Sequence, residues 1–110
     1  MYMEEKLLSM LGIARRAGRL AMGFDAAEEA MRNHQAKLLV LASDVSERTD
    51  RSICRIAEEY KVPVLRTGFE MDRIGKAVGH KHTGVIAIND SGFAKTIKAI
   101  GTENSQEECI

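Results

Sequence analysis

The sequence has too few cysteines to be held together by disulfide bonds. Its 110 residues include two, Cys54 and Cys109, and two are also too few to form a zinc site. No apolar run approaches the roughly 20 residues that span a bilayer, and residues 1–6 lack the basic start of a signal peptide. We therefore expect a cytoplasmic protein that has no membrane partner.

Net charge is absent as well, because 16 lysines and arginines balance 16 aspartates and glutamates. A charge of zero does not by itself indicate a nucleic-acid binder. The distribution is uneven, however, since residues 103–110 carry three glutamates and no base. Residues 1–102 are left with 16 basic and 13 acidic side chains, and Arg15, Arg16 and Arg19 fall close together. This weak basic patch permits an anionic partner.

The common catalytic motifs are missing too. The sequence has no G-x-S-x-G elbow, no P-loop and no G-x-G-x-x-G after a strand. His80 and His82 flank Lys81 with no third metal ligand nearby, so we interpret them as loop residues or phosphate contacts. Asp44 ends a predicted strand but lacks the second carboxylate that would hold Mg²⁺. We expect no enzymatic activity, no metal and no cofactor.

Helical and strand-like patterns alternate along the chain. Residues 38–42 and 85–88 are unbroken apolar runs, which are typical of strands buried on both faces, and a shorter strand is expected at 62–66. Residues 20–22 could add a short fourth strand. Helical periodicity predicts five helices, whose apolar faces lie within residues 7–14, 26–31, 53–60, 74–78 and 93–100. Because each helix returns the chain across a sheet face, the pattern predicts an α/β fold with a mixed, mainly parallel sheet.

Polar residues and glycines suggest where the helices begin and end. Asp25, three residues before Glu28, is interpreted as the cap of the second helix. Asp44, Ser46 and Thr49 offer caps for the third helix, and Asp44 is the favoured one. Thr67 has capping-box spacing for the fourth helix. Asp90 or Ser91 is expected to cap the last helix, and Gly101 to end it. A capping glycine there would place a single domain at residues 1–101 and an acidic flexible tail at 102–110.

Two blocks of sequence, in this order and at this separation, resemble a known family. They are residues 36–45 (AKLLVLASDV) and 75–79 (GKAVG), with residues 16–31 before them and 60–64 between them. This succession is similar to the kink-turn RNA-binding ribosomal proteins, known in archaea as L7Ae and in eukaryotes as L30e, and to their small bacterial homologues. The resemblance covers about residues 5–100 and implies a three-layer α/β/α sandwich.

The resemblance implies a non-enzymatic protein that binds RNA at the start of the second helix and at the loop after the fourth. A helix start offers free N–H groups to phosphate, and Gly23 would allow close approach of a bent RNA. The partner would be a structured, kink-turn-like RNA, with rRNA and hence the ribosome as candidates, and we expect a monomer. The implied RNA contacts are Arg16, Arg19, Gly23, Phe24, Asp25, Ala26, Glu29, Lys37, Val78, His80, Lys81 and His82.

The second-helix segment departs from the family's Gly-x-Asn-Glu-x-x-Lys pattern at three positions. Asp25 replaces the Asn, and its carboxylate cannot donate to guanine O6 but accepts from guanine N1–H or N2–H. Ala26 replaces the Glu, and Glu29 replaces the Lys with a charge that repels phosphate. An alternative function therefore stays open, namely a protein-interaction module on the same scaffold whose RNA binding is weakened or lost.

Overall fold

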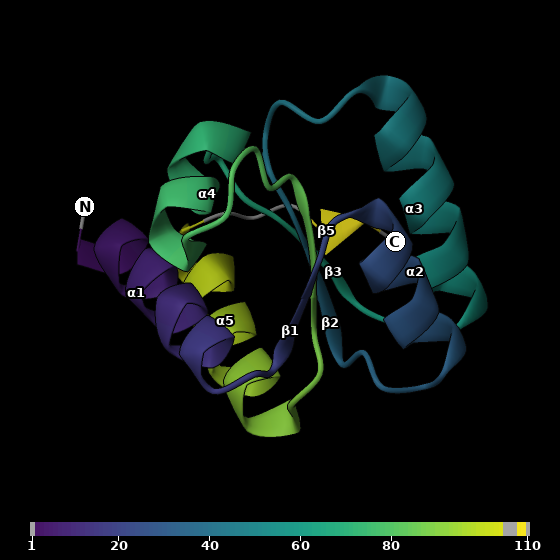
Figure 1. The fold of residues 1–110 in the computed structure, drawn as a ribbon, viewed down its shortest axis with the longest axis horizontal. Helices are drawn as coiled ribbons and strands as arrows, with labels where there is room; N and C mark the ends of the chain where they lie inside the picture. Colours follow the sequence, from purple (N-terminus) through teal and green to yellow (C-terminus); the bar gives the residue numbers. More distant parts are fainter. Residues whose placement is uncertain (1, 105–107, 110) are drawn as a thin grey trace.

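The protein is a mixed sheet with a layer of helices on each face, as Figure 1 shows. The computed structural model describes residues 2–104 and 108–109. Helices α1 (Tyr2–Arg16), α4 (Met71–Val78) and α5 (Ser91–Asn104) cover one face, and α2 (Phe24–Arg32) and α3 (Glu47–Glu59) cover the other. This arrangement confirms the predicted α/β fold and the three-layer α/β/α sandwich.

The sheet has the strand order β1-β4-β2-β3-β5. Its strands are β1 (Leu20–Met22), β2 (Leu38–Leu41), β3 (Val64–Arg66), β4 (Val85–Ile88) and β5 (Glu108–Cys109). In the described part of the chain only β2 and β3 pair in parallel, whereas β4 is antiparallel to both β1 and β2, and β5 to β3. The sheet is mixed as predicted, but the expectation that it is mainly parallel is wrong.

The reason for this error lies in where α4 returns the chain. The registers place the end of β3, Arg66, beside the end of β2, Leu41, and Leu41 in turn beside the start of β4, Val85. The connection through α4 therefore leaves β3 and enters β4 at the same end of the sheet, so β4 runs antiparallel to β2. Strands β1, β2 and β3 do run in one direction, but β4 inserts between β1 and β2.

The two central strands are buried on both faces, as their unbroken apolar runs predict. All four residues of β2 and all four of β4 are buried. Val40 and Ile86 pack with α1, α4 and α5, and Leu39 and Ala87 pack with α2 and α3. Two hydrophobic clusters, one on each side of the sheet, thus share the same pair of strands. In residues 2–104 and 108–109, no helix has the length and apolarity needed to cross a bilayer.

Among the caps predicted for α3, α4 and α5, Asp44 and Thr67 are wrong, whereas Ser46 and Asp90 are confirmed. Ser46 caps α3 by accepting from the Thr49 N–H, while Asp44 Oδ1 accepts from the Met71 N–H at the start of α4 (2.9 Å). Thr67 does not cap α4, because its hydroxyl donates to the Leu41 carbonyl and accepts from the Phe69 N–H, which precedes the helix. At the start of α5, Asp90 Oδ2 accepts from the backbone N–H three residues on, as predicted.

The last helix does not end at Gly101, contrary to the prediction. Helix α5 continues to Asn104, so residues 102–104 of the predicted tail are helical, and residues 108–109 pair with Val64 and Leu65. Gly101 is buried, and a Cβ there would lie 2.4 Å from Leu65 Cδ2. The glycine therefore lets α5 approach the sheet instead of ending the helix. The rest of the predicted flexible tail, 105–107 and 110, lies outside the described residues.

Replacing Gly101 by alanine tests this close approach. Alanine stabilises an ordinary helix interior by about 1 kcal/mol relative to glycine. Here we expect Gly101→Ala to lower the free energy of unfolding by about 1–2 kcal/mol, because the new methyl group overpacks against Leu65. Urea denaturation measures the change, with Ala99→Gly at an exposed position of the same helix as the control for helix propensity. A more stable Gly101→Ala protein would contradict the packing.

Candidate nucleic-acid interface

The start of α2 is built from backbone rather than from a capping side chain. Gly23, the residue before the helix, has φ 99°, a conformation that favours glycine. Its N–H donates to the Val85 carbonyl of β4 (2.8 Å), and its own carbonyl accepts the first helical hydrogen bond from Ala27 (3.0 Å). Gly23 thus joins the β1–β4 pairing directly to the first turn of α2.

Because Gly23 has no side chain, the first N–H groups of α2 receive no cap. Asp25, predicted to cap this helix, instead lies exposed in its first turn, so that prediction is wrong. The N–H groups of Phe24, Asp25 and Ala26 have no hydrogen-bond acceptor among the described residues. Together with the positive end of the helix dipole, they form a place where an anion such as phosphate can bind.

The loop after α4 is held tightly against that helix. Gly79 ends α4 in the left-handed conformation, φ 71°, and the His80 N–H donates to the Gly75 carbonyl (2.9 Å). A Cβ at Gly75 would lie 2.3 Å from the His80 carbonyl oxygen, so a glycine is needed for the loop to approach α4 this closely. Thr83 is 2% exposed, and its hydroxyl donates to the same carbonyl (3.1 Å). The loop therefore has a fixed shape.

These contacts assign the tautomer of His80. Its Nδ1 lies 3.0 Å from Thr83 Oγ1 and 3.2 Å from the Lys81 carbonyl oxygen. A carbonyl only accepts, and the Thr83 proton is already donated, so Nδ1 carries a proton and donates to both. In the neutral ring Nε2 is then an acceptor. Because His80 is exposed, Nε2 is available to a donor on a ligand.

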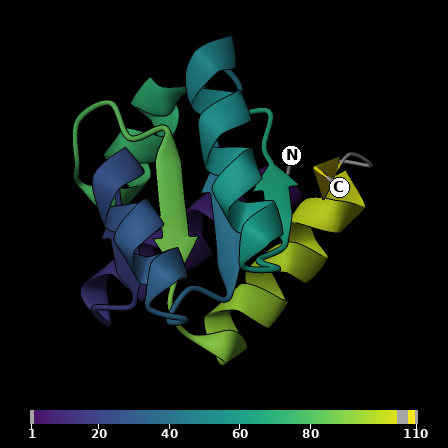
Figure 2. The same cartoon turned by 90° about the vertical axis from the view of Figure 1, so that its right-hand side faces the viewer.

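The start of α2 and the loop meet at one end of the sheet. The loop runs through Gly84 into Val85, whose carbonyl accepts from the Gly23 N–H. Figures 1 and 2 both show the loop passing beside the first turn of α2. We call residues 23–26 and 79–83 the loop surface. Seven of the predicted RNA contacts lie on this surface, and all seven are exposed or half-buried: Gly23, Phe24, Asp25, Ala26, His80, Lys81 and His82.

The structure separates two predicted contacts, Arg19 and Lys37, from the loop surface. The Arg19 carbonyl accepts from the Asn89 N–H, and the Lys37 N–H donates to the Ile88 carbonyl. Both residues therefore lie at the far end of β4, roughly 10 Å along the strand from Val85. The cause is the antiparallel pairing of β1 with β4, which a one-dimensional pattern does not reveal.

The remaining predicted contacts have other surroundings. Val78 is 4% exposed and packs in the core beside α1, so its side chain supports the loop and is not available to a ligand. Glu29 is exposed on α2, one turn after Asp25. Arg16 is exposed at the end of α1 and lines a groove between α1 and α4.

One cation beside the loop surface was not among the predicted contacts. Lys76 lines a shallow cavity of about 340 Å³, together with Asp72, Gly75, Gly79, His80, Lys81 and His82. Lys76 could have been found from the sequence, because it is a cation in the GKAVG block, one turn before a glycine-rich loop. Within the described residues, no three histidine, cysteine, aspartate or glutamate side chains are grouped so as to hold a metal ion.

Comparisons with known proteins agree with this architecture. The model of the ribosomal protein L7Ae/L30e/S12e/Gadd45 family matches residues 5–98. A curated relative named RNA-binding protein YlxQ, from Enterococcus faecium, is 33% identical over 97 residues, which are 88% of this chain and 92% of that protein. RNA-binding protein YlxQ from Bacillus subtilis (strain 168) is 32% identical over 88 residues, 80% of this chain and 87% of that protein.

Two solved structures are similar as well. A protein of unknown function from Bacillus halodurans C superposes with a TM-score of 0.81 at 33% identity, covering 86% of this chain and 95% of that one. The Giardia lamblia 15.5kD RNA binding protein superposes with a TM-score of 0.73, covering 94% of this chain and 88% of that one. Its identity is 16%, so this second likeness shows the shared fold alone.

Thr83→Val tests whether the loop depends on the buried hydroxyl. The substitution keeps the shape of the side chain but removes its hydrogen bonds with His80, so we expect the free energy of unfolding to fall by about 1–2 kcal/mol. Amide hydrogen exchange at residues 80–82 should become faster. Thr96→Val, at an exposed position of α5, serves as the control. Unchanged exchange in the Thr83 variant would show that the hydroxyl does not hold the loop.

Proposed function

The chain belongs to the ribosomal protein L7Ae/L30e/S12e/Gadd45 family, and from this premise we propose that it binds a bent, kink-turn-like RNA at the loop surface. The family membership confirms the resemblance seen in the sequence. The proposed function is non-enzymatic. We propose rRNA or another structured RNA as the target. The protein would act as a monomer, in translation and in the cytoplasm.

The observation that carries the proposal is the uncapped start of α2. Three neighbouring N–H groups, those of Phe24, Asp25 and Ala26, face outward at the positive end of a helix. Gly23 has no side chain, so an RNA backbone can approach these groups closely. Bent RNA presents closely spaced phosphates and unstacked bases, and it is recognised through shape and backbone more than through groove sequence.

The loop supplies the second half of the proposed surface. Lys81 provides a cation for phosphate, and the exposed rings of His80 and His82 offer a stacking face to unpaired bases. His80 is oriented in advance by its hydrogen bond to Thr83, and Nε2 accepts from a ribose hydroxyl or a base amine. Because the loop is already ordered, little conformational entropy is lost on binding.

The altered residues of α2 should change affinity and selectivity. Asp25 is exposed beside the free N–H groups, where its carboxylate repels phosphate and accepts from the N1–H and N2–H of a guanine. Glu29 follows one turn later on the same side of the helix and adds a second repulsive charge. We therefore propose that this protein binds RNA more weakly than a protein with the family's Gly-x-Asn-Glu-x-x-Lys pattern, and that it selects a different base edge.

Gel-shift titration tests the proposal with a kink-turn RNA and a straight duplex of equal length. We expect the parent to prefer the kink-turn. The triple change Asp25→Asn, Ala26→Glu and Glu29→Lys should strengthen kink-turn binding, because it restores a base-edge contact worth about 1–3 kcal/mol and removes a repulsive charge. Binding of the duplex should change far less than binding of the kink-turn.

A matched pair of single changes locates the surface. Lys81→Ala should weaken kink-turn binding and flatten its dependence on salt, because a phosphate contact is lost. Arg19→Ala removes the same charge at the far end of β4 and should leave binding nearly unchanged. If the parent binds neither RNA and the triple variant gains nothing, the RNA proposal fails and the protein-interaction module is the better account.

A further inference from the structure

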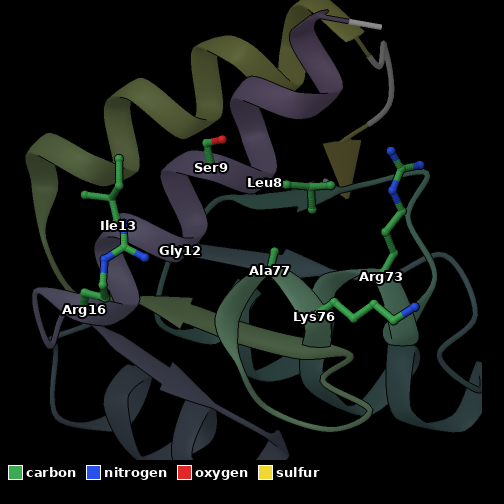
Figure 3. Close-up of a pocket in the computed structure, with 8 residues that line it drawn as sticks. All are labelled: Leu8, Ser9, Gly12, Ile13, Arg16, Arg73, Lys76 and Ala77. Carbon is green, nitrogen blue, oxygen red and sulfur yellow. The ribbon is translucent and has the colours of Figure 1, made fainter.

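A groove runs along the surface between α1 and α4, outside the loop surface (Figure 3). It has a volume of about 550 Å³ and is lined by Leu8, Ser9, Gly12, Ile13, Arg16, Arg73, Lys76 and Ala77. The two helices approach closely here, since a Cβ at Gly12 would lie 2.9 Å from the Ala77 carbonyl oxygen. The groove is therefore part of the packed framework rather than of a loop.

The charged residues that line the groove are all cations. Arg16 lies at one end of the groove, Arg73 at the other, and Lys76 between them on α4 (Figure 3). None of the eight lining residues is acidic. Arg73 lies over the ring of Phe69, with 5.0 Å from its guanidinium carbon to the ring centroid. Among the described residues, Arg16 and Lys76 form no ion pair. The groove thus carries the charges of Arg16 and Lys76, which no ion pair within the described part of the chain neutralises.

This charge is continuous with the loop surface. Lys76 lines both the groove and the shallow cavity that contains His80, Lys81 and His82. A band of cations therefore extends from Arg16 at the end of α1, across Lys76, to Lys81. The longest extent of the protein is 33 Å, which is close to one turn of a nucleic-acid double helix, about 34–36 Å in DNA. One helical stem is long enough to follow this band.

We propose that the α1/α4 groove binds the phosphodiester backbone of an RNA stem that extends from the loop surface. The inference rests on the proposed function, because the loop surface must first hold the bend from which the stem leaves. Arg16, Lys76 and Lys81 are exposed, and Asp72 is the one acidic side chain among the described residues that line the groove and the cavity, so this surface suits regularly spaced phosphates. The groove also contains apolar groups, including Ile13, which is 41% exposed, and these would suit an acidic protein segment instead. Continuity with the loop surface favours the RNA stem.

The experiment compares two kink-turn RNAs that differ only in stem length. One has stems of about one helical turn and the other stems of about four base pairs, so only the first reaches along the groove. Arg16→Gln should weaken binding of the long-stem RNA roughly three- to tenfold, lower the slope of log K against log salt by about one, and leave the short-stem RNA unchanged. Lys95→Gln, on α5, is the charge-matched control and should have no effect on either RNA.

A second variant adds charge without removing a contact. Ser9→Glu places a carboxylate in the groove and should weaken long-stem binding by a similar factor, whereas Ser52→Glu, on α3 at the opposite face of the sheet, should not. Melting curves establish that each variant is folded.

The outcomes separate this inference from the proposed function. If the parent binds no kink-turn RNA, the proposed function and the inference both fail. If the parent binds and the two groove variants match their controls, the inference alone is overturned, in favour of an acidic protein partner for the groove. Equal losses on long- and short-stem RNA also overturn it, because the groove would then not contact a stem.

Discussion

The architecture depends on strand β4, which is buried on both faces and paired on both edges. Its start, Val85, accepts a hydrogen bond from Gly23 and follows directly on the loop from α4. Two segments that are more than 50 residues apart in the sequence are thus fixed at one end of a rigid strand. Because β4 lies between β1 and β2, it cannot shift without exposing both hydrophobic clusters. The loop surface therefore inherits the rigidity of the core, as binding through a fixed shape requires.

A chain of zero net charge can still present a cationic surface if its ion pairs are unevenly placed. On the α2/α3 side, Arg32 pairs with Glu28, Arg51 with Glu47, and Arg66 with Asp50. The Arg66 hydrogen bond and charge hold the pKa of Asp50 below its usual value, so this acid stays ionised at neutral pH. Such surface pairs contribute little stability, but they cancel the local field. In the α1/α4 groove, Arg16 and Lys76 form no ion pair with any residue that the structure describes, so their field extends into solvent.

Hydrophobic pattern predicted the elements but not their directions. The runs at 38–42 and 85–88 indicated two strands buried on both faces, which is correct, yet apolar periodicity is the same for parallel and antiparallel neighbours. Because strand direction was unknown, Arg19 and Lys37 were predicted to lie with Gly23. Only the antiparallel pairing shows that both residues lie at the far end of β4. Asp44 is a correct cap assigned to the wrong helix: a carboxylate at a strand end reaches any helix start nearby in space, here that of α4.

The division between backbone and side chains explains how the loop surface could serve the proposed RNA binding despite its altered residues. The N–H groups at the start of α2 are fixed by Gly23 and the β1–β4 register, and no side-chain change at Asp25 or Glu29 removes them. Phosphate contacts of this kind position an RNA, whereas base-edge contacts specify it. For the proposed RNA binding, substitutions on the first two turns of α2 would therefore act on selectivity and on electrostatic repulsion while the geometry persists. By the same reasoning, a change at Gly75 acts on geometry, because the loop could no longer approach α4.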